Sequence, residues 1–163
     1  MGKAIVIAFA LVATWSSVAA QRAPSKVEGS RARLPIVEVF KSPTCGCCSK
    51  WIGHMRQHGF TVTSTDLADV SVIKKQHQVP GAVSSCHTAL VDGYVVEGHV
   101  PATDVLRLLK TRPAVAGIAV PKMPIGSPGM EVEGTKPEPY DVVSFDKQGN
   151  TKVFSSHRPT TQR

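Results

Sequence analysis

Strand-like and helix-like patterns alternate between residues 35 and 109, and this alternation limits the possible folds more than any other feature of the sequence. Pro35 to Lys41 is rich in branched apolar residues, which predicts a strand. From Cys47 to His58 the apolar residues recur at helical spacing, and Gly59 then predicts the end of a helix. A second strand over 60–67 and a short helix that ends near His77 are expected to follow.

The next part of the sequence predicts a hairpin and a further helix. Residues 87–91 and 94–97 are strand-like, and Asp92-Gly93 between them is a strong hairpin turn. Pro101 suits the first turn of an apolar-faced helix. The resulting order, β-α-β-α-β-β-α, predicts an α/β (α+β) fold with a thioredoxin-like sheet and flanking helices. We interpret it as two βαβ-type crossovers that feed one sheet, followed by a hairpin and a final helix.

The C-terminal part extends beyond a minimal domain of this kind. Residues 120–130 are rich in Pro and Gly, and 140–145 with 151–155 predict another hairpin. We expect this hairpin to form a C-terminal β appendage on the same core. The predicted domain therefore covers residues 34–157, and residues 158–163 form a flexible tail.

The N-terminus has the pattern of a secretory signal peptide over residues 1–20. Lys3 provides the positive charge, residues 4–12 are apolar, and small residues precede an expected cleavage after Ala20. An uncleaved anchor is the alternative, although the apolar run is short for a membrane span. A polar, flexible leader is expected over 21–33, and no membrane span is expected after cleavage. We therefore predict a periplasmic protein in a cell with two membranes.

The distribution of the basic residues argues against a nucleic-acid partner. The formal charge is +7 at pH 7, but the basic residues are dispersed and aromatic residues make up only 6% of the chain. A nucleic-acid site normally gathers basic residues in one patch or stripe. No nucleic acid is therefore expected among the partners.

The cysteines form the most specific chemical motif. Cys45, Cys47 and Cys48 lie at the predicted junction of a strand and a helix, where the helix N-terminus stabilises thiolates. Cys86 directly precedes the predicted third strand. In a thioredoxin-like fold the loop before this strand faces the N-terminus of the first helix. The four thiols are therefore expected to form one site.

Three chemistries are compatible with this cluster. Structural disulfides are common in exported proteins, but bridges within CGCC would close very small loops. Thiol–disulfide exchange through Cys45 and Cys48 suits the C-x-x-C spacing, although Cys47 inside the motif would interfere with a simple dithiol. Dense thiolates also select soft metals, namely Cu(I), zinc or iron–sulfur clusters.

The other candidate ligands favour Cu(I) within the metal-binding hypothesis. Two C-x-x-C knuckles of a zinc site and the usual iron–sulfur spacings are both absent from the sequence. Met123 and Met130 lie in the Pro/Gly-rich segment and offer soft thioethers, with packing against the sheet as the alternative role. His87, beside Cys86, and His99, after the hairpin, are the candidate histidine ligands.

Charge also favours several copper ions over one. Four thiolates carry four negative charges, and a helix N-terminus offsets only about half a charge. Each Cu(I) cancels one charge, and bridging sulfurs allow ions to share ligands. A single ion with protonated thiols at low pH is the alternative. Turnover is not evident from the sequence, so a copper oxidoreductase and a copper-binding protein both stay open.

Several sequence blocks occur in an order that resembles a known family. They are Ser42-Pro-Thr-Cys-Gly-Cys-Cys48, Ser85-Cys-His-Thr-Ala89, Glu97-Gly-His-Val-Pro101 and Met123-Pro-Ile-Gly-Ser-Pro-Gly-Met-Glu131. The chain is similar to the bacterial metal-binding family catalogued as domain of unknown function 411, from Pro35 to about His157. The resemblance implies a thioredoxin-like fold and a multinuclear Cu(I)–thiolate cluster held by the four cysteines.

The same resemblance carries functional expectations. It implies a place in a copper-resistance system, with interconversion of Cu(I) and Cu(II) as a candidate activity. A copper exporter or another periplasmic copper protein is the candidate protein partner.

Overall fold

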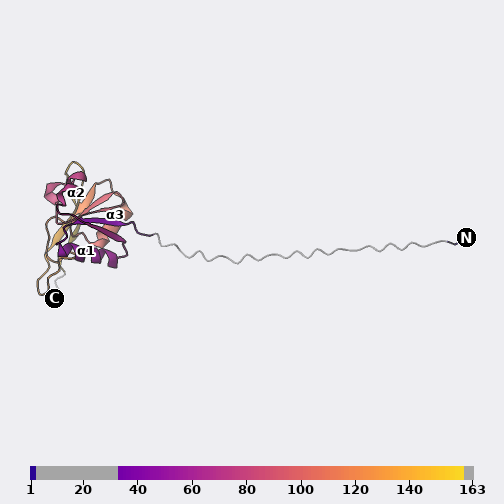
Figure 1. The fold of residues 1–163 in the computed structure, drawn as a ribbon, viewed down its shortest axis with the longest axis horizontal. Helices are drawn as coiled ribbons and strands as arrows, with labels where there is room; N and C mark the ends of the chain where they lie inside the picture. The colour runs from indigo at the N-terminus through magenta and orange to yellow at the C-terminus, as the bar shows by residue number, and fades with distance from the viewer. Residues whose placement is uncertain (3–32, 160–163) are drawn as a thin grey trace. The chain divides into compact units, whose positions relative to one another are not determined.

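The strands of the protein pair into one mixed sheet. The computed structural model describes residues 1–2 and 33–159 (Figure 1). Most of the predicted signal peptide, most of the predicted leader and the last tail residues lie outside the described part. Within it, seven strands follow the order β2-β1-β3-β4-β5-β6-β7. The elements are β1 (Val37–Lys41), α1 (Gly46–Gln57), β2 (Val62–Asp66), α2 (Ser71–Gln76), the 3-10 helix η1 (Gly81–Val83), β3 (Thr88–Val91), β4 (Tyr94–Glu97), α3 (Ala102–Thr111), β5 (Gly117–Ala119), β6 (Tyr140–Phe145) and β7 (Thr151–His157).

The mixed α/β class and the order of elements predicted up to α3 are confirmed. The description as thioredoxin-like is our interpretation of that order. In the described residues, no helix is long and apolar enough to span a membrane.

The helices pack on the two faces of the sheet. Alternating residues of β1, such as Val37 and Val39, are buried against Trp51 and Met55 of α1 and Leu108 of α3 in the larger core. A smaller core on the other side joins η1 to β4, β5 and β6. Figure 1 places α1 and α2 on opposite sides of the strands. This arrangement fixes the first turn of α1 against the sheet.

One of the two predicted βαβ crossovers is wrong. β1 and β2 are parallel and joined by α1, as expected. β3, however, is antiparallel to β1, with Phe40 opposite Thr88. The end of β2 and the start of β3 therefore lie at the same end of the sheet, and the six-residue α2 joins them without crossing it. The second parallel pair is β4 and β5, which α3 connects.

The C-terminal hairpin forms where the sequence predicted it, on the same core. β6 and β7 are antiparallel, and β6 also pairs with β5. β5 was missed because its three residues, between a Pro-containing turn and a long loop, are too few to show a pattern. This short strand pairs with both β4 and β6, so the hairpin continues the sheet.

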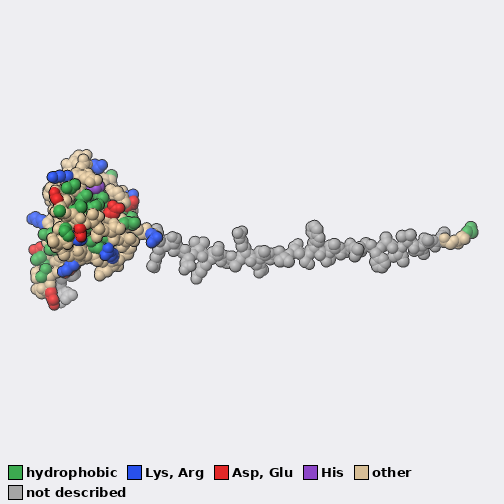
Figure 2. Space-filling view, viewed as in Figure 1, with side chains coloured by type: hydrophobic (Ala, Val, Ile, Leu, Met, Phe, Trp, Pro, Cys, Tyr) green, Lys and Arg blue, Asp and Glu red, His purple; other side chains and the backbone are tan. Residues whose placement is uncertain are grey.

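The surface charges are dispersed. Figure 2 shows Lys and Arg interspersed with Asp and Glu over the visible face. This distribution agrees with the inference from the sequence that no basic stripe exists on that face.

Candidate metal centre

The CGCC motif lies at the junction of β1 and α1. Pro43 cannot continue a strand, and the N–H of Cys45 donates to the carbonyl of Ser42 at 3.1 Å, which closes a tight turn. Cys45 is the N-cap residue of α1, with extended φ and ψ of −79° and 94°. Cys47 and Cys48 occupy the first turn. The three side chains therefore surround the end of the helix where free N–H groups and the helix dipole favour negative charge.

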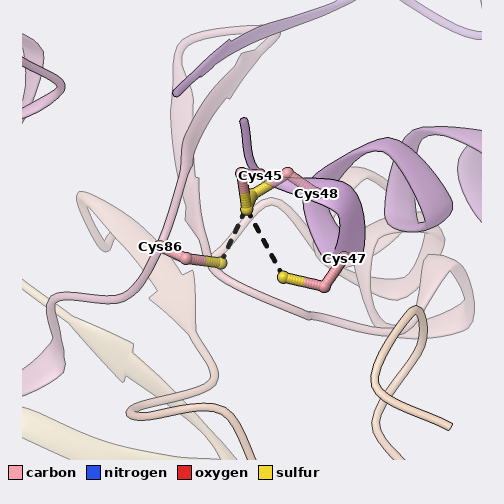
Figure 3. Close-up of side chains that lie close together, drawn as sticks. All are labelled: Cys45, Cys47, Cys48 and Cys86. Atoms are coloured by element: carbon pink, nitrogen blue, oxygen red, sulfur yellow. Dashed lines mark hydrogen bonds between the residues drawn. A yellow bond between two sulfur atoms is a disulfide. The ribbon is translucent and has the colours of Figure 1, made fainter. Parts of the chain in front are cut away.

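Cys86 lies opposite this turn because of the strand order. β3 is beside β1, and the register that pairs Phe40 with Thr88 places the residues before β3 next to the residues after β1. The Sγ atoms of Cys48 and Cys86 are 3.6 Å apart, although the two residues are 38 positions apart in sequence. The expected meeting of Cys86 with the CGCC turn is thus observed, and Figure 3 shows the four side chains converging.

Cys45 and Cys48 are joined by a disulfide, with their Cα atoms 5.4 Å apart. Cys47 and Cys86 are free thiols. The Sγ of Cys47 lies 3.4 Å from that of Cys45, so each free thiol borders one half of the disulfide (Figure 3). The four sulfur atoms all lie within 4.8 Å of one another. Reduction of one disulfide would therefore provide four adjacent thiols.

His99 is oriented by the loop that precedes Met130. Its ring is fully buried, and its Nδ1 lies 2.8 Å from the carbonyl oxygen of Pro128. A carbonyl can only accept, so Nδ1 carries the proton and Nε2 has a free lone pair. Burial lowers the pKa of His99, which favours this neutral form. The Nε2 atom lies 3.0 Å from the Sγ of Cys86.

His87 is the second histidine at the site. It is fully buried and packs on Trp51, with ring centroids 4.5 Å apart. Its Nδ1 lies 3.3 Å from the Sγ of Cys86, whereas its Nε2 is buried and has no hydrogen-bond partner among residues 33–159. Burial, and then the nearby His99, lower its pKa well below the ordinary value. Cys86, His87 and His99 form a second group of potential ligands within 4.8 Å of one another.

The thiol of Cys86 is strongly held in its protonated form. Burial raises its pKa to about 12, and the negative charge of Cys47 adds to this effect. Both causes penalise an uncompensated thiolate, and a cation bound among the sulfurs would compensate its charge. The electrostatics of this pocket therefore favour a bound cation over a bare thiolate.

The structure places the two methionines differently. Gly129 lies against the first turn of α1, because a Cβ there would come within 2.7 Å of the carbonyl oxygen of Cys47. Met130 directly follows this contact and is half-buried. Met123 is 48% exposed and lines a surface cavity of about 550 Å³ with Tyr140. Both remain predicted ligands, and the position of Met130 fits that role better.

The donor set fits a soft metal ion. Thiolates and neutral imidazoles are ligands that Cu(I) accepts, and the hydrogen bond from His99 to a carbonyl is the outer contact that usually orients a metal-binding histidine. The Nε2 of His87 is a further buried atom that lacks a hydrogen-bond partner in the described part of the chain. The fit requires reduced Cys45 and Cys48, because a disulfide offers no thiolate.

The fold and the site together define a mixed α/β protein with a thiol-rich candidate metal centre. A profile of the family described as "Protein of unknown function, DUF411" matches residues 83–130. A solved structure called copper resistance protein CopG, Form 1, is 43% identical, with a TM-score of 0.71, over 76% of this chain and 98% of that one. The Form 2 structure is 42% identical, with a TM-score of 0.72, over 77% and 99% of the two chains.

The chain therefore belongs to the family of these CopG copper resistance proteins, and residues 83–130 also match the DUF411 profile. A search of the curated proteins found no match. The family resemblance inferred from the sequence blocks is confirmed.

A buried polar network beside Cys86 was not predicted. Glu97, at the end of β4, has no exposed surface and binds Lys74 of α2 and the backbone of Ser85. The only signal in the sequence is a carboxylate that directly follows the apolar residues Tyr94-Val95-Val96. Lys74 could not have been identified as its partner without the fold.

Proposed function

We propose that the protein is a periplasmic Cu(I)-binding protein of copper resistance. It holds a multinuclear Cu(I)–thiolate cluster between the CGCC turn and Cys86. The observation that carries this proposal is the convergence of all four sulfur atoms within 4.8 Å. Membership in a family whose solved members are called copper resistance proteins gives independent support.

His87 and His99 extend the ligand set on the Cys86 side. Both are neutral and buried, and each has a ring nitrogen within 3.3 Å of the Sγ of Cys86. Neutral imidazole is the form that binds metal, so no deprotonation cost accompanies their use. Met130 is the candidate thioether ligand, while exposed Met123 suits an encounter with incoming copper.

The charge of the reduced site favours more than one ion. Four thiolates would place four negative charges in a half-buried pocket, and unpaired buried charge is costly. Each Cu(I) removes one charge, and sulfurs this close together can bridge neighbouring ions. The copper is the cargo of the site, so its stoichiometry can be measured directly.

The disulfide also supports interconversion of copper oxidation states. Two Cu(II) ions can accept one electron each from the thiols of Cys45 and Cys48, which yields two Cu(I), one disulfide and two protons. The reverse step would oxidise two Cu(I) while the disulfide is reduced. Cys45 and Cys48 are the pair that the structure joins. The protein would then be an oxidoreductase for copper as well as a binding protein.

Thiol–disulfide exchange with another protein is the second candidate function. The disulfide between Cys45 and Cys48 at the start of α1 favours it, because such a C-x-x-C pair is typical of dithiol oxidoreductases. This function needs Cys45 and Cys48 alone. It should therefore survive replacement of both Cys47 and Cys86 by Ser.

The decisive experiment compares metals and variants in one assay. Reduced protein is titrated anaerobically with Cu(I), and the thiolate-to-copper absorption is followed. We expect a break at several equivalents, no displacement by Zn(II), and loss of the cluster in Cys86→Ser. Displacement by zinc, or a single-equivalent break at neutral and mildly alkaline pH, would contradict the proposal. Insulin reduction by the Cys47→Ser/Cys86→Ser double variant at the wild-type rate would favour thiol–disulfide exchange.

We also propose that the protein is exported and that it passes copper to a protein partner. Intact mass of the periplasmic fraction is expected to show a chain that begins at Gln21. A full-length protein retained in the membrane would instead support the uncleaved anchor. The candidate partner, a copper exporter or another periplasmic copper protein, would take Cu(I) from the loaded cluster.

A further inference from the structure

Glu97 is a buried carboxylate whose hydrogen-bonding positions are occupied on both oxygens. Oε1 accepts from the N–H of Ser85 at 2.6 Å and pairs with the ammonium group of Lys74. Oε2 accepts from the hydroxyl of Thr88 at 2.7 Å, and Lys74 also donates to this hydroxyl at 3.1 Å. The carboxylate therefore connects α2, β3 and the loop that carries Cys86 at one point.

The contact to Ser85 is one of three contacts at hydrogen-bond distance that join residues 85–87 to residues 97–99. The N–H of Ser85 donates to Glu97, and the N–H of Gly98 donates to the carbonyl of His87 at 3.0 Å. Between them, Nε2 of His99 lies 3.0 Å from the Sγ of Cys86. The spacing between Cys86 and His99 is therefore set by hydrogen bonds on either side of it.

These two segments approach so closely that a glycine is required. A Cβ on Gly98 would lie 2.5 Å from the Oγ of Ser85 and 2.9 Å from the carbonyl oxygen of Val120. Gly98 also has a φ of +72°, which side chains disfavour. Ser85 in turn donates to the carbonyl of Lys122 at 2.6 Å, at the start of the Pro/Gly-rich segment. Glu97 thus holds a tightly packed segment.

Stability alone does not explain this arrangement well. Burying two charges costs desolvation, and replacing a buried ion pair with apolar residues is often neutral or stabilising. The carboxylate of Glu97 accepts one hydrogen bond from the N–H of Ser85, the residue directly before the candidate ligand Cys86. Outer contacts of this kind commonly fix the geometry of metal ligands.

We propose that Glu97 is a positioning residue for the copper site, which holds Cys86 against the CGCC turn and next to His99, with Lys74 as its counter-ion. This inference rests on the proposed copper function. Glu97 itself does not contact the metal. It acts through its hydrogen bond with the N–H of Ser85, the residue directly before Cys86.

The test compares two double variants that both remove the buried charges. Lys74→Met/Glu97→Gln retains an amide oxygen that can accept from Ser85, whereas Lys74→Met/Glu97→Leu does not. We expect the Gln variant to bind Cu(I) within about threefold of wild type. The Leu variant should bind about 10- to 100-fold more weakly, as is usual when an outer contact is lost. Affinity is measured by competition with a Cu(I) chelator.

A second readout is independent of copper. In a Cys45→Ser/Cys47→Ser/Cys48→Ser background, Cys86 is the remaining thiol, and its alkylation rate reports how firmly its segment is held. The Leu variant should increase this rate about tenfold over the Gln variant, because local opening becomes easier. Wild type that fails to bind copper would refute the proposed function, while the alkylation rates would still decide the role of Glu97.

Two further variants separate positioning from stability. Asp104→Asn removes a buried carboxylate that binds Ser155 and His157 instead. It should lower stability without changing copper affinity or Cys86 alkylation. If the Leu variant does not fold, Glu97→Asp retains the charge but shortens its reach to Ser85, and it should weaken Cu(I) binding about tenfold. Equal copper affinity and equal alkylation in the Gln and Leu variants, or unchanged affinity in Glu97→Asp, would overturn the proposal.

Discussion

The disulfide between Cys45 and Cys48 should control how much copper the protein can hold. In the oxidised chain, the two free thiols are Cys47 and Cys86. Reduction doubles this number, since the chain has four cysteines. If each Cu(I) neutralises one thiolate, the charge to be neutralised falls from −4 to −2 on oxidation. We therefore expect the copper capacity to fall from as many as about four equivalents to about two.

The assay titrates Cu(I) anaerobically into two samples of the same protein. One sample is reduced and freed of reductant, and the other keeps the disulfide. Thiol counts by Ellman's reagent in denaturant, where buried Cys86 also reacts, should give four and two per chain, in agreement with the cysteines that the structure describes. The break in the thiolate-to-copper absorption should then occur at about half the copper concentration in the oxidised sample.

The matched control is Cys45→Ser/Cys48→Ser, which lacks the disulfide and two of the donors under all conditions. Its capacity should equal that of the oxidised protein and should not change with reductant. The reasoning is refuted if oxidised and reduced wild type show the same break. It is also refuted if the control holds as much Cu(I) as the reduced wild type.

Three other predictions concern named side chains. Burial is the largest cause of the raised pKa of Cys86, and it persists in the metal-free triple Ser variant, which lacks the charge of Cys47. The alkylation rate of Cys86 in this variant should therefore rise about tenfold per pH unit from about pH 8 to about pH 10; a plateau near pH 9 would contradict this. Gly98→Ala should lower the free energy of unfolding by about 2–4 kcal/mol, since φ is +72° and the new Cβ would meet Ser85. Gly93→Ala, where φ is +85° but the space is open, should lower it by only about 1–2 kcal/mol. Urea denaturation measures both values. Asp104→Asn should lower the free energy of unfolding by about 1–3 kcal/mol because Ser155 and His157 lose a buried charged acceptor; an unchanged free energy of unfolding would refute this interpretation.

Local patterns were sufficient to predict most elements of the fold. Branched residues of β1, the helical spacing in α1 and the turn at Asp92-Gly93 each act within a few residues. The predicted bounds of these elements lie within two or three residues of the bounds in the structure. β5 is too short for such a pattern, and it depends on neighbours on both sides, β4 and β6. The direction of β3 was not predicted correctly. It depends on whether the chain crosses the sheet between β2 and β3, and the short α2 joins them without crossing.

The candidate site was predictable where it depended on strand order. Cys86 was expected opposite the CGCC turn because the loop before the third strand of a thioredoxin-like fold faces the N-terminus of the first helix, and the two sulfurs of Cys48 and Cys86 do meet. The ring orientation of His99 was not predictable, because it depends on the carbonyl of Pro128 in a loop without regular structure. The ion pair between Lys74 and Glu97 joins elements 23 residues apart and leaves no local pattern.

The contact between His99 and Pro128 also has a consequence for the order of assembly. A chain that emerges N-terminus first exposes the CGCC motif long before residue 128 exists. His99 acquires its hydrogen bond only when a segment 29 residues further on has folded back, and Cys86 meets Cys48 across 38 residues. Contacts of such sequence separation form late, since loop closure precedes any gain from them. The complete ligand set therefore exists only in the folded domain. A growing or partly folded chain offers copper only the thiols of the CGCC motif.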